Sequence, residues 1–258
     1  MPRASRRHDS DAGGSPEVLA AKAELRQEVW AALKAAKATR FPGPDGRIPN
    51  FVGAEAAAER LRGTEAWQSA GTLKSNPDSP QWPVRQRALE DGKLLFMAVP
   101  RLAEEEPFFL LDPEQLAGSA REASSIKGAS KSARPVGLDK LQPVDLVVAG
   151  TVAAGLDGAR LGKGGGFSDL EFAVASEAGL IGPETVVVTT VHEVQVLPAG
   201  AIPTADHDVG LDLIVTPERV IEVHRRSHRP AGAIRWEELT EEKIGAIPLL
   251  ARLRAAGR

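Results

Sequence analysis

The chain has 258 residues, of which 42% are hydrophobic and 26% are charged, so it can form a core without disulfides or structural metals. Its formal net charge of -3 gives no general attraction to nucleic acids or anionic membranes. The absence of cysteine and tyrosine excludes thiolate metal sites, cysteine nucleophiles and tyrosine general acids. No apolar run approaches the ~20 residues of a membrane span. We therefore expect a cytoplasmic protein with no membrane partner and no nucleic-acid partner.

The charged, glycine-rich residues 1–14 predict a disordered tail. The first helix is predicted to begin after Ser15, a favourable N-cap followed by Pro and Glu, and to end near Lys37. Its apolar stripe consists of Val18, Leu25, Val29 and Leu33. Lys22 and Arg26 flank this stripe, so either their stems are buried with the charged ends in solvent, or the pair faces an anion.

The middle of the chain gives weaker signals. An apolar run closed by proline is typical of a buried strand, and small polar residues are typical of loops. These patterns predict helices over Glu55–Arg62 and Pro83–Gly92, a turn at Lys74–Asp78, a strand over Leu94–Val99 and a mobile loop over Gly118–Pro135.

Short apolar strands alternate with helical segments in the second half of the chain. Strands are predicted over Asp145–Ala149, Thr185–Val191, Leu211–Val215 and Val220–Val223, a helix over Ser168–Ala178 and an amphipathic segment over Thr240–Arg254. This alternation is typical of a parallel sheet covered on both faces. We therefore expect an α/β fold with a mostly parallel sheet and helices on both faces.

The densest signal is the segment Gly158–Asp169, with the sequence GARLGKGGGFSD, between a predicted strand and a predicted helix. Its glycines leave backbone N–H groups open to oxyanions, and the following helix adds its own N-terminal donors. Arg160 and Lys163 supply positive charge, and Ser168 with Glu171 fits a capping box. A flexible glycine turn without a ligand is the alternative for this segment alone.

Two standard nucleotide motifs are not met by this segment. A P-loop needs glycine at position 157 and Ser or Thr at position 164, where the chain has Asp157 and Gly164. The dinucleotide fingerprint needs its third glycine where Phe167 lies. The sequence therefore predicts an anion site of neither standard type.

The stretch Arg160–Asp169 resembles the R-L-G-x-G-x-G-Y-Y-D signature of the 5-formyltetrahydrofolate cyclo-ligase (methenyltetrahydrofolate synthetase) family. Lys22–Arg26 resembles its K-x-x-x-R motif, and Asp206–Asp208 with Leu211 and Asp212 resembles its later acidic segment. The motifs follow one order between about residues 20 and 253. They are most similar to the divergent branch of methenyltetrahydrofolate synthetase domain-containing proteins.

The resemblance implies a three-layer α/β fold, a single domain over residues 15–258, and ATP and Mg²⁺ as cofactors. It implies a ligase reaction on a folate-like small molecule, 5-formyltetrahydrofolate or a related N-formyl substrate. The γ-phosphoryl group goes to the formyl oxygen, and ring closure then gives the methenyl product. Phosphorylation converts a poor leaving oxygen into a good one, so the protein needs mainly to position the reactants and stabilise charge. The oligomeric state is not predicted.

The resemblance also implies roles for particular residues. Lys22 and Arg26 would contact the phosphates of ATP, and Asp169 and Asp208 match aspartates associated with the metal, a pair that suits Mg²⁺. From the sequence alone, the two aspartates are equally well explained as a first-turn helix acid and a loop residue. The other nucleotide-binding candidates are Arg160, Gly162, Lys163, Gly164, Gly165, Gly166, Phe167 and Ser168, of which Arg160, Lys163 and Phe167 are also the catalytic candidates.

The departures from the family pattern lie on the substrate side. Phe167 and Ser168 replace its paired tyrosines, and a glutamate-containing segment of the family has no clear counterpart within Lys74–Trp82. A non-catalytic folate or nucleotide binder with a regulatory role is therefore the alternative, followed by an RNA-associated module. A zinc site at His192 and Asp206–Asp208 is disfavoured because the HExxH spacing is absent.

Overall fold

The computed structural model describes residues 14–99, 102–116, 118–224 and 234–257. The predicted tail over residues 1–14 lies, apart from Gly14, outside the described residues. The helices are α1 (Pro16–Ala35), α2 (Ala54–Arg62), α3 (Glu65–Ser69), α4 (Trp82–Glu90), α5 (Ala120–Ala123), α6 (Ile126–Ser132), α7 (Phe167–Glu177), α8 (Glu241–Ala246) and α9 (Pro248–Ala255). The strands are β1 (Thr72–Ser75), β2 (Leu94–Ala98), β3 (Phe108–Leu111), β4 (Arg134–Val136), β5 (Leu146–Val148), β6 (Ala153–Gly155), β7 (Arg160–Leu161), β8 (Val186–Thr190), β9 (Val196–Leu197), β10 (Leu213–Val215) and β11 (Val220–Glu222).

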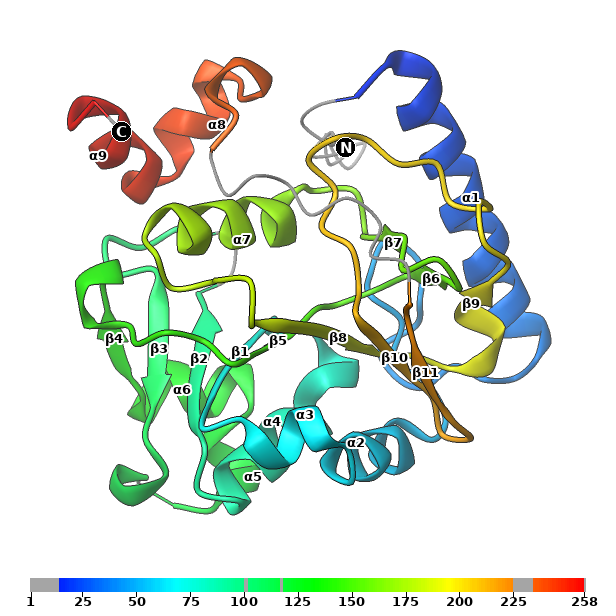
Figure 1. Cartoon of the computed structure of the whole chain (residues 1–258), viewed down its shortest axis with the longest axis horizontal. Coiled ribbons are helices and arrows are strands. Elements are labelled where there is room, and N and C mark those ends of the chain that lie inside the picture. Colours follow the sequence, from blue (N-terminus) through cyan, green and yellow to red (C-terminus); the bar gives the residue numbers. More distant parts are fainter. Residues whose placement is uncertain (1–13, 100–101, 117, 225–233, 258) are drawn as a thin grey trace, which may run out of the picture.

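The main sheet has eight strands in the order β11-β10-β8-β5-β1-β2-β3-β4 (Figure 1). The five strands from β10 to β2 are parallel, whereas β11, β3 and β4 pair antiparallel at the two edges. The central strands are short apolar runs, as expected where both faces of a parallel sheet are buried. The predicted α/β fold with a mostly parallel sheet is therefore confirmed.

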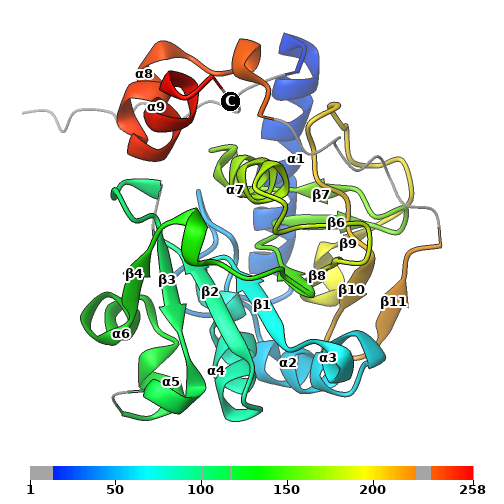
Figure 2. The same cartoon turned by 60° about the vertical axis from the view of Figure 1, so that its left-hand side comes forward.

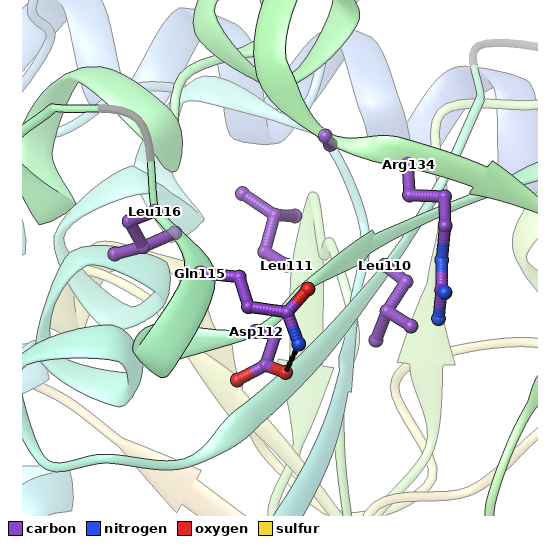
Figure 3. Close-up of a pocket in the computed structure, with 7 residues that line it drawn as sticks. Leu110, Leu111, Asp112, Gln115, Leu116 and Arg134 are labelled. Atoms are coloured by element: carbon purple, nitrogen blue, oxygen red, sulfur yellow. Dashed lines mark hydrogen bonds between the residues drawn. The ribbon is translucent and has the colours of Figure 1, made fainter.

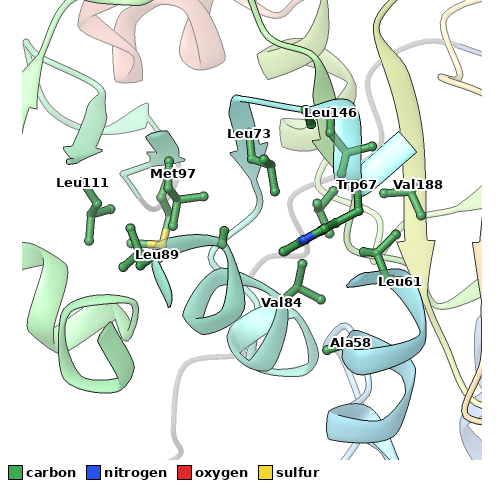
Figure 4. Packing of buried hydrophobic residues seen from close by; sticks show 14 of the residues in the cluster. Ala58, Leu61, Trp67, Leu73, Val84, Leu89, Met97, Leu111, Leu146 and Val188 are labelled. Atoms are coloured by element: carbon green, nitrogen blue, oxygen red, sulfur yellow. The ribbon is translucent and has the colours of Figure 1, made fainter. Parts of the chain in front are cut away.

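Helices cover both faces of this sheet (Figures 1 and 2). On one face, Leu73 and Val188 pack with Trp67 of α3 and with residues of α2 and α4 (Figure 4). On the other face, Val147 and Val187 pack with Phe172 of α7. Hydrogen bonds of Ser168 and Glu171 to Asn76 bring the first turns of α7 to the carboxyl end of β1. Ligands bind at this edge in open sheets of this kind.

A second, three-stranded sheet with the order β7-β6-β9 carries α1. Ser15 caps this helix by accepting a hydrogen bond from the Val18 N–H at 3.3 Å, as predicted. The apolar stripe of α1 packs on the small sheet through Val29, Trp30 and Leu33 against Ala153, Ala159 and Leu161. This packing brings the N-terminal half of α1 to the loop that follows β7.

The structure corrects the predicted turn at Lys74–Asp78. Residues Thr72–Ser75 form β1, which lies between β5 and β2 in the middle of the main sheet. A lysine in a central strand is unusual because a buried ammonium group loses its hydration. Here the Lys74 ammonium donates to the Glu171 carboxylate at 2.7 Å, and this partner allows the strand to be buried.

The predicted mobile loop over Gly118–Pro135 is also wrong. It contains the short helices α5 and α6, whose first turns are capped by the hydroxyl oxygens of Ser119 and Ser125. The strand β3 had no predicted counterpart. Buried alanines of this segment, Ala123 and Ala129, join the core under the main sheet, so packing orders a stretch whose composition is typical of a loop.

The last two helices pack against α7 and lie above it in Figure 2. Pro248 begins α9 and separates it from α8, because proline suits the first position of a helix and disrupts its interior. Their apolar side chains form one cluster with α7, which includes Ile244, Ile247, Leu250, Leu170 and Val174. The C-terminal segment is therefore anchored over the start of α7.

Replacement of Leu73 by alanine tests the central packing. Leu73 is fully buried in β1, so Leu73→Ala should lower the free energy of unfolding by about 2–5 kcal/mol, measured by urea denaturation. Leu156→Ala removes the same atoms from a side chain that is 46% exposed, and it should change the free energy of unfolding by less than about 1 kcal/mol. Equal losses in the two variants would contradict this description of the core.

Candidate functional site

The glycine-rich loop, residues 162–166, joins β7 to α7. Gly164 and Gly166 have φ angles of +103° and +62°, a region that glycine enters without steric cost. Gly166 is the N-cap of α7, so the predicted capping box of Ser168 and Glu171 is wrong. The Ser168 hydroxyl instead donates to the Asn76 side-chain oxygen at 3.1 Å. The helix thus begins at Phe167, and Ser168 is held against the end of β1.

The backbone of this loop is arranged for binding an anion. Within the described ranges, the N–H groups of residues 162–166 make no hydrogen bond to the protein. The Gly162 carbonyl accepts a hydrogen bond from Nε of Arg26 at 2.8 Å. Because the C=O and the next N–H of a trans peptide point in opposite directions, the Lys163 N–H is directed away from Arg26. Successive N–H groups of this kind form anion-binding nests.

Lys22 is buried beside the loop. Its ammonium group donates to both carboxylate oxygens of Asp208, at 2.8 and 2.5 Å, and the two side chains are 4% and 11% exposed. The Ala205 N–H also donates to this carboxylate, at 2.7 Å. The interpretation in which the charged ends of Lys22 and Arg26 lie in solvent is therefore wrong, because both residues are buried.

Arg160 lies in β7, at the base of the loop. Its guanidinium donates to Asp169 Oδ1 at 2.5 Å and to the Gly150 carbonyl at 3.0 Å, and its side chain is 2% exposed. Burial pushes the pKa of Asp169 upward. The Arg160 charge and hydrogen bond, with the Val209 N–H, outweigh burial and bring that pKa below its ordinary value. Asp169 is therefore a carboxylate at neutral pH.

Lys163 is the most exposed cation of the site, with a side chain 45% exposed, and its ammonium group lies 3.0 Å from Asp78 Oδ1. The segment that carries Asp78 is held from below by Arg85, which donates to the carbonyls of Asn76 and Asp78 at 2.7 and 3.1 Å. Burial lowers the pKa of Arg85 to about 10, so it remains charged at neutral pH. The backbone of Asp78 is therefore held in place, whereas the partly exposed side chain of Lys163 has room to move.

A buried polar network supports the site from the sheet side. Asn76 donates to Glu171 at 2.9 Å and accepts from the Gly150 N–H at 2.9 Å, while Lys74 donates to the same carboxylate. The ends of β1 and β5 are thereby joined to the first turns of α7. Sequence reasoning missed this network because Lys74 was predicted in a turn and Glu171 in a cap. The available signal was a charged residue inside each of two otherwise apolar segments, Lys74 and Glu171.

One hollow in the surface brings together every site residue predicted from the sequence. Its lining consists of Lys22, Arg26, Arg160, Gly162, Lys163, Gly164, Gly165, Gly166, Phe167, Ser168, Asp169, His207 and Asp208. These residues come from α1, β7, the glycine-rich loop, α7 and the loop before β10. The convergence agrees with the predicted anion site, while the binding role of each residue remains a prediction.

His207 is the lining residue that the nucleotide prediction did not include. Its Nε2 lies 3.6 Å from Asp208 Oδ1, and its Nδ1 lies 3.1 Å from Glu238 Oε2. The sequence showed it only as part of the acidic segment Asp206–Asp208. Its neighbour Glu238 belongs to the C-terminal segment, whose approach to the site no motif indicated.

The metal predictions concern carboxylates that already have cationic partners. Asp169 and Asp208 both line the hollow, one paired with Arg160 and the other with Lys22. No group of three or more His, Cys, Asp or Glu side chains placed to hold a metal occurs among the residues described. His192, considered for zinc, uses Nδ1 to accept the Val194 N–H at 3.2 Å and so caps the turn after β8.

A second hollow lies beside β3 and β4 (Figure 3). Its walls include Leu110 and Leu111, its one cation is Arg134, and Gln115 Nε2 donates to Asp112 Oδ2 at 2.6 Å. It contains none of the residues predicted for the site. The hollow at the glycine-rich loop is therefore the candidate functional site.

The sequence model of the "5-formyltetrahydrofolate cyclo-ligase family" matches residues 18–217, which include α1, the loop and Asp208. The chain belongs to this family. It is 38% identical over 242 residues to the methenyltetrahydrofolate synthase domain-containing protein of Bos taurus, covering 93% of this chain and 63% of that protein. Against the Homo sapiens protein of the same name, identity is 35%, covering 91% of this chain and 61% of that protein. The chain thus spans just under two thirds of these relatives.

The fold of this family member is similar to a solved structure, the NMR structure of Aquifex aeolicus 5,10-methenyltetrahydrofolate synthetase. The TM-score is 0.50 at 19% sequence identity, covering 79% of this chain and 93% of that one. This similarity concerns the fold alone. None of the helices in the described ranges has the length and apolar character needed to cross a membrane.

The ion pair at the base of the loop predicts a pH-dependent stability. Asp169→Asn leaves buried Arg160 without its counter-charge and should lower the free energy of unfolding by about 1–3 kcal/mol at pH 7. Because the pKa of Asp169 is lowered by folding, its contribution is complete above about pH 4, the unfolded value, and is lost as the pH falls through the folded pKa.

Urea denaturation of wild type and Asp169→Asn between pH 7 and pH 3 measures this effect. The difference between the two proteins should shrink toward pH 3. Asp139→Asn, which changes a side chain that is 72% exposed, is the matched control and should behave as wild type throughout. A difference that is the same at both pH values would show that the charge of Asp169 does not stabilise the fold.

Proposed function

We propose that this protein is an ATP-dependent cyclo-ligase that acts on 5-formyltetrahydrofolate or a related N-formyl substrate. The γ-phosphoryl group of ATP is transferred to the formyl oxygen, giving ADP. A second nitrogen of the substrate attacks the activated formyl carbon and loses its proton to solvent, and the C–O bond breaks with release of inorganic phosphate. With 5-formyltetrahydrofolate the product is 5,10-methenyltetrahydrofolate. Membership of the cyclo-ligase family supports this reaction type.

The observation that carries the proposal is the run of backbone N–H groups over residues 162–166 without a protein acceptor in the described chain, surrounded by cations. Four cations and two carboxylates line the hollow, which leaves two positive charges when His207 is neutral. A polyphosphate bound there would receive both backbone hydrogen bonds and charge stabilisation. Fixed donors aimed at a transferring phosphoryl group are the main source of catalysis in such reactions.

The residues divide into fixed and movable groups. Arg160 and Arg26 are held by the protein backbone at the Gly150 and Gly162 carbonyls, so they would shape the phosphate site. Lys163 is exposed enough to follow the phosphoryl group as it transfers. Phe167 offers an aromatic face at the start of α7, where it would pack against the substrate. These assignments give each catalytic candidate a separate task.

Asp169 and Asp208 would hold Mg²⁺ in this site, together with phosphate oxygens and water, because hard cations of this type take oxygen ligands. Bound there, Mg²⁺ would neutralise charge on the phosphates. These residues suit the ion because two carboxylates line the same hollow. Asp208 and Asp169 are now paired with Lys22 and Arg160. If phosphates bind, these two cations could pair with the phosphates while the carboxylates pair with the metal ion, so no charge would be left without a partner.

Turnover is tested with purified protein, Mg-ATP and 5-formyltetrahydrofolate. The methenyl product should be seen as an increase in absorbance with equimolar release of phosphate. Lys163→Met should lower kcat/KM at least about tenfold, because it removes a charge-assisted contact to the transferring group. Lys127→Met removes an exposed lysine of α6 and is the matched control, with unchanged kcat/KM.

One result would contradict the proposed reaction, and another would contradict the role of Lys163 in it. Saturable binding of ATP or folate without phosphate release, even at high enzyme concentration, would establish the alternative of a non-catalytic binder. Wild-type turnover with equal kcat/KM in Lys163→Met would keep the reaction but remove Lys163 from the phosphoryl-transfer step. Unchanged melting temperatures in both variants ensure that the comparison reports on the site.

A further inference from the structure

The C-terminal segment, residues 234–257, contacts the candidate site although the match to the family covers only residues 18–217. Its helices are fixed on α7 by the apolar cluster described above, which includes Ile244 and Leu250. In Figure 2 this segment lies above α7, and its apolar side chains share a cluster with α7 and with the edge of the main sheet. It therefore adds a rigid element to a site whose other parts lie within the family match.

Lys243 of α8 reaches the glycine-rich loop itself. Its ammonium group donates to the Gly165 carbonyl at 3.0 Å and lies 5.1 Å from the centre of the Phe167 ring. A cation over an aromatic ring is attracted to its negative face, so the ring helps to hold the ammonium group in place. Lys243 is half-buried, and its neighbour Ile244 is buried in the apolar cluster. The lysine is thus anchored where it meets the loop.

The contact fixes the direction of one peptide group. With the Gly165 carbonyl held toward Lys243, the N–H of Gly166 in the same trans peptide is directed away from Lys243. Arg26 acts in the same way on the carbonyl of Gly162. Glycine at 164 has no side chain to restrict its backbone, so a loop without these two contacts would sample other orientations.

We propose that Lys243 is a positioning residue of the nucleotide site, which holds the Gly165–Gly166 peptide so that its N–H faces the phosphates. This inference rests on the proposed function. It makes the C-terminal helices a part of the functional site. The segment also meets the site at a second point, where Glu238 contacts His207 of the lining at 3.1 Å. The two contacts come from residues on either side of Thr240, so this part of the segment lies against the site.

The test is the affinity for Mg-ATP, measured by isothermal titration calorimetry in the full chain. Lys243→Met should raise the dissociation constant about tenfold, because the loop loses both the hydrogen bond and the nearby charge. Lys243→Arg keeps a donor and a cation and should remain within about threefold of wild type. Arg254→Met removes a cation that pairs with Glu241 in the same segment without touching the loop, and it should bind as wild type.

The outcomes separate this inference from the function on which it rests. Absence of Mg-ATP binding by the wild-type protein would overturn the proposed function, and the role of Lys243 with it. Binding by wild type with an equal dissociation constant in Lys243→Met would overturn the role of Lys243 alone. Weaker binding in Lys243→Met and Arg254→Met alike would show that the docking of the segment, and not the contact of Lys243 with Gly165, is what matters. Thermal unfolding of the ligand-free variants establishes that each is folded.

Discussion

The glycine-rich loop is held by its carbonyl groups, and this constraint determines what its amides can do. Cationic side chains from the two ends of the chain, Arg26 and Lys243, bond to the carbonyls of Gly162 and Gly165. In each trans peptide the next N–H is directed away from the held carbonyl, so the Lys163 N–H points away from Arg26 and the Gly166 N–H points away from Lys243. Donors held in this way would lose little entropy when an anion binds.

The same site has to remain stable when no anion is present. A buried cation without a partner would destabilise the fold by several kcal/mol, and here the carboxylates of Asp208 and Asp169 face the buried Lys22 and Arg160. Under the proposed function, binding of a phosphate would be an exchange of one anionic partner for another, and its net free energy would be smaller than the number of cations suggests. The carboxylates released by this exchange would become available to a metal ion, which would couple metal binding to nucleotide binding.

The parts of the fold predicted from sequence are those in which local pattern and tertiary environment agree. Apolar β-branched runs such as Val186–Thr190 form strands in either context. Lys74 was assigned to a turn because its burial depends on Glu171, which lies 97 positions further along the chain. The contact of Lys243 with the loop was missed for the same reason, since single-sequence patterns carry no information on which distant segments meet.

The contacts of Phe167 and Ser168 within the protein limit how the site could hold a substrate. The chain has Phe167 and Ser168 where the signature that it resembles has two tyrosines. The Ser168 hydroxyl donates inward to Asn76, and the Phe167 ring lies under the Lys243 ammonium group, so both side chains are engaged by the protein. Hydrogen bonds to an acceptor substrate must then come from other groups of the lining, among which Lys163 and His207 carry donors. In the proposed reaction, such a site would keep its backbone donors for the phosphates, although its hydroxyls are lost or turned inward. The acceptor would then be oriented mainly by the charged groups of the lining, since the hydroxyls of the tyrosine pair are absent.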